Sequence, residues 1–501
     1  MRAFLISLAA GLITVGGFAP FNLYPLAVLG LTMLFWQWHH AVSPRAGFLS
    51  GWGFGLGLFG AGVSWIYISL HQYGGMSAWL AALATSLFCA FLALFPAAAG
   101  ALFIYFRRHA SALLWLAPAL WVVQEWVRGW IFTGFPWLAL GYSQVPASPL
   151  AGYAPLIGVY GVSYLVALFA ALLTWILAYR HARRSWVWGS VGIVVLLGLG
   201  WGLRFPEWTT PIGSPTSVAL VQANIAQEMK WRPEKTAQTL ARYAELIAAH
   251  PAQLIVLPET ALPLFESELP PAYRVMLVQT GKQNGGDIIV GLPTGSPRGA
   301  YYNSVLSFGA APTQAYHKFH LVPFGEYIPM KPLWGWIIEV LHIPLSDFAR
   351  GSPTQRPLQV GGQAVAMNIC YEDAFGEEII RQLPAASVLA NVSNVAWFGD
   401  SLALWQHGQI SQMRALETGR MMLRATNTGL TALIDNKGVM RAHLPPYQEG
   451  VLRGMVTGYS GSTPYIRWGN APILMLSLGS LVLALVMLQR LRVRSLLTRR
   501  R

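Results

Sequence analysis

Long apolar runs separated by short polar stretches constrain the fold of this chain more than any other feature. Seven of them precede residue 204 and one lies near the C-terminus. They are Ala3–Phe18, Pro25–Trp38, Gly47–Leu70, Trp79–Phe106, Ser111–Trp130, Gly152–Tyr179, Trp186–Leu203 and Ala471–Leu488. A helix needs about 20 mostly apolar residues to span a bilayer. We therefore predict an α-helical membrane bundle of about eight spans.

The composition agrees with a membrane protein, because charged residues make up 11% of the chain and hydrophobic residues 54%. That balance is too apolar for an ordinary soluble protein. Acidic residues are almost absent before Leu203, whereas the stretch from there to about Arg467 reads like a soluble domain. We predict three parts: a bundle of seven spans over 1–207, a soluble domain over 208–467, and an eighth span with a basic tail over 468–501.

Arginines between the apolar runs predict which side of the membrane each loop faces. They gather in alternate loops and after the last run, at Arg45, Arg107, Arg108, Arg180, Arg183, Arg184 and between Arg490 and Arg501. Positively charged loops stay in the cytoplasm, so both termini are expected there and the 208–467 domain outside. The net charge of +14 is then an orientation signal and a contact with anionic membrane lipids, and it implies no nucleic-acid partner.

The predicted external domain alternates strand and helix patterns. Strand-like segments are Ser217–Asn224, Leu254–Leu257, Ile288–Gly291, Tyr302–Phe308, Gln363–Ile369, Ser387–Ala390 and Thr428–Ile434. Thr236–Ala249 and Leu404–Leu423 read as helices. Two sheets with helices outside them would form a layered α/β sandwich, in which catalytic groups gather at strand ends.

Two cysteines sit in very different settings. Cys89 lies within an apolar run, whereas Cys370 ends a strand-like stretch and precedes the helix-like run Phe375–Leu383. Backbone N–H groups and the helix dipole at such a turn are expected to favour the thiolate and to hold an oxyanion.

A carboxylate and an ammonium occupy two further strand ends. Glu259 follows Leu254–Leu257, and Lys318 follows another extended stretch. Carboxylate, ammonium and thiol suit acyl transfer through a thioester, with one base, one oxyanion-stabilising cation and one nucleophile. Each is common alone, but the three together predict an active site. The histidines lack partners at metal-ligand spacing, and the glycines form no phosphate loop, so neither a metal nor a cofactor is expected.

The segments that carry these residues resemble the nitrilase (carbon–nitrogen hydrolase) superfamily. Three flanking segments resemble its membrane-embedded branch, the apolipoprotein N-acyltransferases: Thr133–Trp137, His320–Glu326 and Ser393–Gly399. The resemblance to this branch covers nearly the whole chain. The resemblance implies a nitrilase-like αββα sandwich, with Glu259 as general base, Lys318 as oxyanion stabiliser and Cys370 as nucleophile.

Further residues carry roles by the same resemblance. Supporting positions close to the triad are Glu326, Tyr371 and Glu372. Positions expected to contact lipid or substrate are Trp231, Trp334, Trp336, Asn394 and Trp397. The chain departs from the family pattern at Val395, where the family usually has Asp, which puts a hydrogen bond from that position in doubt.

The implied reaction belongs to lipoprotein maturation at the bacterial inner membrane, with a periplasmic catalytic domain and cytoplasmic termini. A phospholipid, typically phosphatidylethanolamine, donates its sn-1 acyl chain to Cys370. The α-amine of the diacylglyceryl-modified N-terminal cysteine of an apolipoprotein then attacks the thioester. We also expect the apolar segment Met330–Leu345 to form a lid that dips into the outer leaflet.

Two alternatives stay open at this point. A membrane-tethered amidase or nitrile hydrolase would use the same triad with water as acceptor, and lipid-facing apolar segments argue against it. A transporter with an accessory domain would need polar groups within several spans. The chain offers essentially Gln124, Glu125 and Arg128, all near one end of a run.

Overall fold

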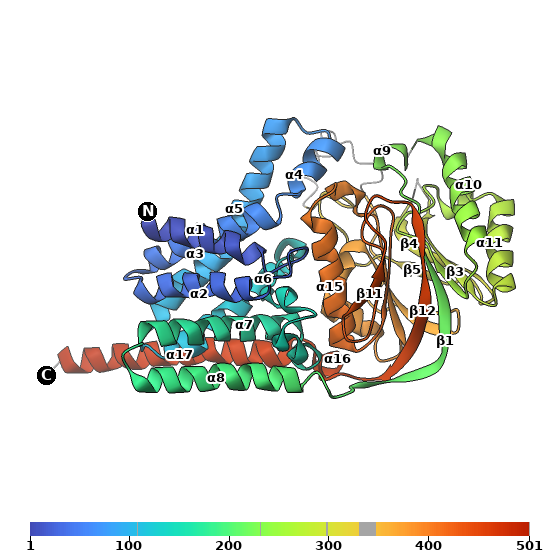
Figure 1. Ribbon diagram of the computed structural model, residues 1–501. Helices are drawn as coiled ribbons and strands as arrows, with labels where there is room; N and C mark the ends of the chain where they lie inside the picture. The colour runs from blue at the N-terminus through green and yellow to red at the C-terminus, as the bar shows by residue number, and fades with distance from the viewer. Residues whose placement is uncertain (108, 231, 297–298, 330–346, 500–501) are drawn as a thin grey trace. The chain divides into compact units, whose positions relative to one another are not determined.

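The computed structural model describes residues 1–107, 109–230, 232–296, 299–329 and 347–499 (Figure 1). The chain divides into two compact units. The helical unit comprises Met1–Ser64, Ala82–Pro206 and Trp468–Arg501, and the α/β unit comprises Trp65–Ala81 and Glu207–Arg467.

The predicted apolar runs all form helices. These are α1 (Arg2–Val15), α2 (Pro25–His40), α3 (Pro44–Gly62), α5 (Ala78–Phe106), α6 (Ala112–Arg128), α7 (Ala154–Ala178), α8 (Arg183–Gly202) and α17 (Ala471–Arg499). Within the described residues, four helical stretches are long and apolar enough to cross a membrane: Ala78–Phe106, Pro149–Ala178, Arg183–Gly202 and Ala471–Arg490. The pair Pro44–Gly62 and Ile66–Tyr73, bent by 57°, would be a fifth. The count of eight spans stays a prediction.

Small residues allow the first helices of the helical unit to approach closely. A Cβ atom on Gly11 of α1 would lie 2.0 Å from the carbonyl oxygen of Phe54 on α3, so only glycine fits. Close backbone contact of this kind is how helices pack where lipid removes the hydrophobic drive for their association.

The charged pair of α6 holds a loop of the helical unit. The Glu125 carboxylate accepts hydrogen bonds from Trp121 Nε1 and the Leu140 backbone N–H, both at 2.9 Å. Arg128 Nη1 donates to the Trp137 carbonyl at 2.6 Å. These contacts satisfy the backbone carbonyl of Trp137 and the backbone N–H of Leu140.

Two six-stranded sheets form the centre of the α/β unit. The first has the order β12-β1-β2-β3-β4-β5 and the second β11-β10-β9-β8-β7-β6. Strands of the first sheet are β1 (Thr209–Gln222), β2 (Leu254–Val256), β3 (Asp287–Gly295), β4 (Tyr301–Gly309), β5 (Ala315–His317) and β12 (Gly450–Gly461). Those of the second are β6 (Leu358–Val360), β7 (Gln363–Ile369), β8 (Val388–Ser393), β9 (Met422–Thr426), β10 (Ala432–Ile434) and β11 (Met440–His443).

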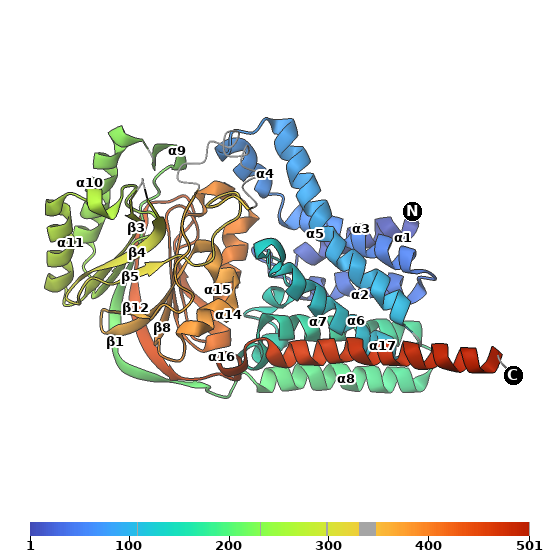
Figure 2. The same ribbon diagram turned by 180° about the vertical axis from the view of Figure 1, so that it is seen from behind.

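A buried apolar layer fills the space between the sheets. Alternate residues such as Leu220 and Val256 of the first sheet belong to one cluster with Met367 and Val392 of the second. Side chains alternate across a strand, so the other set faces outward and is covered by helices. The helices α10 (Pro233–Ala249) and α11 (Pro271–Gln283) cover the first sheet, and α14 (Gly376–Ile379) and α15 (Leu402–Thr418) cover the second (Figures 1 and 2). The predicted two-sheet sandwich is therefore confirmed.

Several predicted bounds are wrong. The helix predicted over Leu404–Leu423 ends at Thr418, because Gly419 adopts φ +61° and a new strand, β9, begins at Met422. The apolar run Gly47–Leu70 breaks after Gly62, and its last residues form α4 (Ile66–Ile68) and the start of the π-helical segment η1 (Ser69–Tyr73). These residues group with the α/β unit, although they fall within the predicted 1–207 bundle.

Candidate active site

Strand ends position the three predicted catalytic side chains. Glu259 follows β2, Lys318 follows β5 directly, and Cys370 begins the 3-10 turn η6 (Cys370–Ala374) directly after β7. Lys318 Nζ lies 3.2 Å from Glu259 Oε1. Both charges act on the Cys370 thiol across the two sheets. The structure thus gathers the three groups that the sequence placed at strand ends.

Glu326 completes a buried ionic cluster with Glu259 and Lys318. Lys318 Nζ lies 2.9 Å from the Glu326 carboxylate. Asn303 Nδ2 donates to Oε1 of both carboxylates at 2.7 Å. The backbone N–H of Asn394 donates to Glu259 Oε2 at 2.8 Å. Two carboxylates therefore share one ammonium, which is 1% exposed. We call these four side chains, Glu259, Lys318, Glu326 and Asn303, the reactive cluster.

Opposite charges keep both partners of this contact ionised. Burial opposes ionisation of Glu259, but the charge of Lys318, with hydrogen bonds from Asn303 and Asn394, lowers the pKa of its carboxyl below the usual value. Burial likewise opposes protonation of Lys318, yet Glu259 and Glu326 raise the pKa of its ammonium. At neutral pH the site holds a carboxylate base beside a cation.

Cys370 rests as a thiol. Burial, followed by the charge of Glu259, raises the pKa of the thiol to about 12, against the opposing effects of Lys318 and Arg424. The expectation that the turn favours the thiolate is therefore wrong. The turn η6 is only five residues long, and two nearby carboxylates outweigh the cations. Ionisation of this thiol at neutral pH would need a base, and Glu259 is the carboxylate whose charge acts most strongly on the thiol pKa.

Hydrogen bonds hold Cys370 in a strained backbone conformation, with φ at +54°. Its carbonyl oxygen accepts from Asn391 Nδ2 and faces His407 Nε2, both at 3.1 Å. A non-glycine residue in this region costs on the order of 1–3 kcal/mol and persists only where its surroundings fix it. These contacts therefore fix the turn that presents the thiol.

Glu372 joins the Lys318 segment to the Cys370 turn. Its Oε1 accepts from the backbone N–H groups of Phe319 at 2.7 Å and His320 at 3.1 Å. Its Oε2 accepts from the Ile369 N–H at 2.6 Å and the Tyr316 hydroxyl at 3.0 Å. One buried carboxylate thus bridges strand ends from both sheets. This bridge is a physical reason to expect Glu372 to support the site.

Comparisons with known proteins match both parts of the chain. Residues 10–172 match the apolipoprotein N-acyltransferase N-terminal domain, and residues 217–465 match the carbon–nitrogen hydrolase family. An apolipoprotein N-acyltransferase from Nitrosomonas europaea is 52% identical over 483 residues, 96% of each chain. One from Chromobacterium violaceum is 45% identical over 97% of this chain and 95% of its own. The chain belongs to the apolipoprotein N-acyltransferase family.

Membership of the apolipoprotein N-acyltransferase family confirms the resemblance seen in the sequence motifs. Among solved structures, a mutant of a Nesterenkonia amidase from the nitrilase superfamily covers 52% of this chain and 97% of its own, at 19% identity and a TM-score of 0.38.

The departure from the family pattern at Val395 is accommodated by packing. The Val395 side chain is fully buried. A Cβ atom on Gly429 would lie 2.2 Å from its Cγ2, so the two residues are in close contact. Val395 thus contributes an apolar contact at this position. The neighbouring Asn394 side chain donates from Nδ2 to Gln227 Oε1 at 2.8 Å.

A distant segment supports the loop around Trp397. Ser69 Oγ donates to the Trp397 carbonyl at 2.6 Å, and the ring of Tyr73 lies 5.9 Å from the Trp397 ring. Trp65 packs against Phe398 with ring centroids 4.5 Å apart. Sequence reasoning missed this contact, because a single serine in an apolar run carries no signal. The segment thus stabilises the loop whose Asn394 N–H donates to the Glu259 carboxylate.

A second set of buried charges lies beside the Cys370 turn. Arg424 Nη1 donates to Ser411 Oγ at 3.0 Å and lies 3.5 Å from Asp373 Oδ2. Ser411 also donates to Asp373, and His407 Nε2 lies 3.8 Å from the same carboxylate. We call Asp373, Arg424, His407 and Ser411 the support cluster.

The remaining predicted residues lie near the site or outside the described residues. Tyr371 packs against Phe375, with ring centroids 5.2 Å apart. Trp231, Trp334 and Trp336, with the predicted lid Met330–Leu345, lie outside the described residues.

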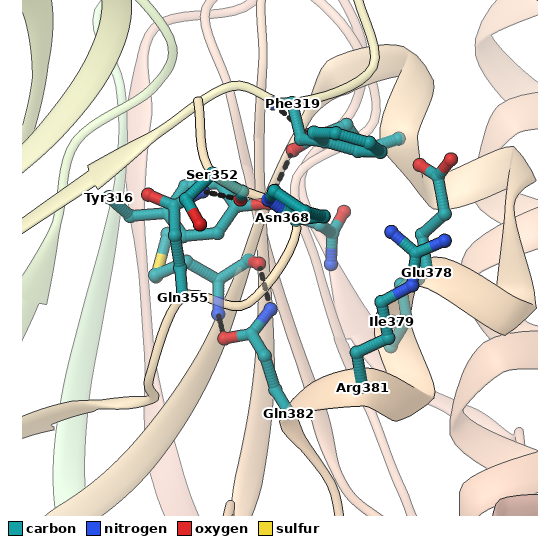
Figure 3. Close-up of a pocket in the computed structure, with 12 residues that line it drawn as sticks. Tyr316, Phe319, Ser352, Gln355, Asn368, Glu378, Ile379, Arg381 and Gln382 are labelled. Atoms are coloured by element: carbon teal, nitrogen blue, oxygen red, sulfur yellow. Dashed lines mark hydrogen bonds between the residues drawn. The ribbon is translucent and has the colours of Figure 1, made fainter. Parts of the chain in front are cut away.

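Glu372 also helps to line a pocket (Figure 3). Its lining includes Tyr316, Phe319, Asn368 and Gln382, and none of the triad. Gln382 donates from Nε2 to the Met367 carbonyl at 2.8 Å and so closes one wall. No residue of the reactive cluster lines this pocket.

Proposed function

We propose that this chain transfers an acyl chain from a phospholipid, through a thioester on Cys370, to the α-amine of a diacylglyceryl-modified apolipoprotein. The observation that carries the proposal is the 3.2 Å contact between Glu259 and Lys318, with both charges acting on Cys370. This site occurs in a chain that matches an apolipoprotein N-acyltransferase over 96% of its length.

The first half-reaction forms the thioester. Glu259 takes the thiol proton as Cys370 Sγ attacks the ester carbonyl of the donor. Negative charge then develops on the carbonyl oxygen, where the Lys318 ammonium stabilises it. Collapse breaks the ester C–O bond, and the proton passes from Glu259 to the leaving oxygen, which gives a lysophospholipid. We propose the sn-1 chain of phosphatidylethanolamine as the donor.

The second half-reaction transfers the chain to nitrogen. The neutral α-amine of the acceptor attacks the thioester carbonyl, and Glu259 accepts a proton from nitrogen. Collapse breaks the C–S bond, forms the amide and returns the proton to sulfur. Glu259 thus accepts and returns a proton in both half-reactions. This role suits a carboxylate that is held ionised beside a cation.

Membrane attachment fits both substrates. Each is held in the bilayer by acyl chains whose transfer to water costs about 0.8 kcal/mol per CH₂. We propose eight spans in the bacterial inner membrane, over 1–207 and 468–501, with cytoplasmic termini. The 208–467 domain is then periplasmic, as the arginine placement indicates.

The decisive experiment offers the enzyme both kinds of acceptor. Purified protein in vesicles receives phosphatidylethanolamine labelled in the sn-1 chain and a synthetic diacylglyceryl-cysteine peptide. We expect the label on the peptide amine, with lysophospholipid released in equal amount. Label released only as free fatty acid, together with hydrolysis of a simple amide, would favour the membrane-tethered amidase.

Topology is tested separately with single cysteines. In a Cys89→Ala, Cys370→Ala background, Lys282→Cys lies on the exposed surface of α11 and Arg184→Cys is exposed on α8. An impermeant thiol reagent outside the inner membrane should label position 282 and leave position 184 unlabelled. The reverse pattern would overturn the proposed orientation.

A further inference from the structure

Lys230 is a buried cation next to the catalytic base. It ends the short helix α9 (Gln227–Lys230), and 3% of its surface is exposed. Its Nζ donates to the backbone carbonyl of Glu259 at 3.2 Å. Among the described residues this is the one hydrogen bond of its ammonium. Lysine is almost never fully buried without a paired charge, so the position calls for an explanation.

The charges of the reactive cluster show which negative charge the Lys230 ammonium offsets. Glu259 and Glu326 supply two negative charges to the reactive cluster, and Lys318, in contact with both, supplies one positive charge. Arg424, the nearby cation on the other side of Cys370, lies against Asp373. The charge of Lys230 lowers the pKa of Glu259, and the charges of Glu259 and Cys370 in turn raise the pKa of Lys230. With Lys230 protonated, the two lysines and two carboxylates balance.

We infer that Lys230 is an electrostatic positioning residue of the active site. Its ammonium holds the Glu259 backbone, and its charge offsets that of Glu326, so that negative charge can develop on sulfur and on the oxyanion. The inference rests on the proposed acyl transfer through Cys370. Without this charge, thiolate formation would add negative charge to a cluster that is already negative.

The ionisation of Lys230 gives this role a pH dependence. Burial lowers the pKa of its ammonium to about 8, although Glu259 and Cys370 partly offset the effect. The groups around Lys230 titrate at other pH values. The pKa of Glu259 is lowered, that of Lys318 is raised, and that of Cys370 is about 12. Because Lys230 is charged below its pKa and neutral above it, thioester formation should decline as the pH rises through about 8.

The test separates charge from hydrogen bonding. In a Cys89→Ala background, Cys370 is the one cysteine of the chain. Lys230→Met, Lys230→Arg and Lys230→Gln are compared with Lys282→Met, a lysine exposed on α11. Two rates are measured across neutral and alkaline pH: alkylation of Cys370 by iodoacetamide, and thioester formation from phosphatidylethanolamine vesicles without acceptor.

Loss of the charge should slow both rates. A rise of about one unit in the thiol pKa makes alkylation of Lys230→Met and Lys230→Gln about tenfold slower at a given pH. Both variants should also lose the decline in thioester formation near pH 8. Lys230→Arg should keep the rates and move the decline to higher pH, since guanidinium stays charged. Lys282→Met should match the parent protein.

Two results would overturn the inference. One is that Lys230→Gln performs as well as Lys230→Arg, which would show that a neutral hydrogen bond suffices. The other is an alkylation profile that does not change in any variant. Because arginine and glutamine both keep a donor, their comparison remains informative if Lys230→Met fails to fold. Failure of the proposed function looks different, since the parent protein would then form no thioester on Cys370, or Cys370→Ala would still transfer acyl chains.

Discussion

Two buried clusters of charged side chains lie near Cys370. They contain similar residue types but make different contacts with it. In the reactive cluster, two carboxylates share the Lys318 ammonium, and their charges act on the thiol. In the support cluster, Arg424, Ser411 and His407 surround one carboxylate, Asp373, while His407 also contacts the Cys370 carbonyl. Burial of charge alone therefore does not mark a catalytic group. Although Arg424 also acts on the thiol, the support cluster differs in its contact with the backbone carbonyl of Cys370.

Arg424→Met should give the largest effect, and it should fall on stability. It leaves the Asp373 carboxylate buried without its cation, which costs about 3–5 kcal/mol. The free energy of unfolding of the purified protein measures the loss, and Arg441→Met, a mostly exposed arginine paired with Asp435, serves as the control. If Arg424→Met unfolds like the parent protein, the support cluster has no structural role.

Lys318→Met and Glu259→Gln should act on rate. Losing one oxyanion donor costs on the order of 10²–10³ in rate, so Lys318→Met should slow both half-reactions by that factor. Glu259→Gln should also slow both half-reactions, and thioester formation the more, because the thiol at its raised pKa then lacks a base. Single-turnover measurements with and without acceptor separate the steps. Near-parental turnover in either variant would remove that residue from the site.

Ser69→Ala should give the smallest effect. It removes the bond to the Trp397 carbonyl, worth about 0.5–1.5 kcal/mol, and loosens the loop that positions Glu259. We expect a severalfold fall in kcat with little change in KM, whereas Ser64→Ala, an exposed serine nearby, should change neither. An equal loss in both variants would mean that the segment contributes only general packing.

Local patterns account for what the sequence predicted. Glu259, Lys318 and Cys370 each follow a buried strand within their own motif, so position and residue type together indicated chemistry. The strands β1, β3 and β7 were visible in part because each contains a short buried apolar run.

Long-range contacts account for most of what the sequence did not predict. The Ser69–Trp397 bond joins residues 328 positions apart. Lys230 differs from the lysines near the surface in being buried, and no pattern in the sequence shows that burial. Strands β5, β6 and β11 are three or four residues long and too short for periodicity. The raised pKa of Cys370 results from burial and several charges acting together, so the turn by itself gave the wrong direction.

The mass of the enzyme after exposure to phospholipid tests the central claim most directly. Protein carrying Cys89→Ala is incubated with phosphatidylethanolamine vesicles of one defined acyl chain, without acceptor, and its intact mass is measured before and after hydroxylamine. We predict a gain of one acyl chain that hydroxylamine removes, and no gain in the Cys89→Ala, Cys370→Ala protein. An adduct that persists in the doubly substituted protein, or transfer without any adduct in the parent, would contradict a thioester on Cys370.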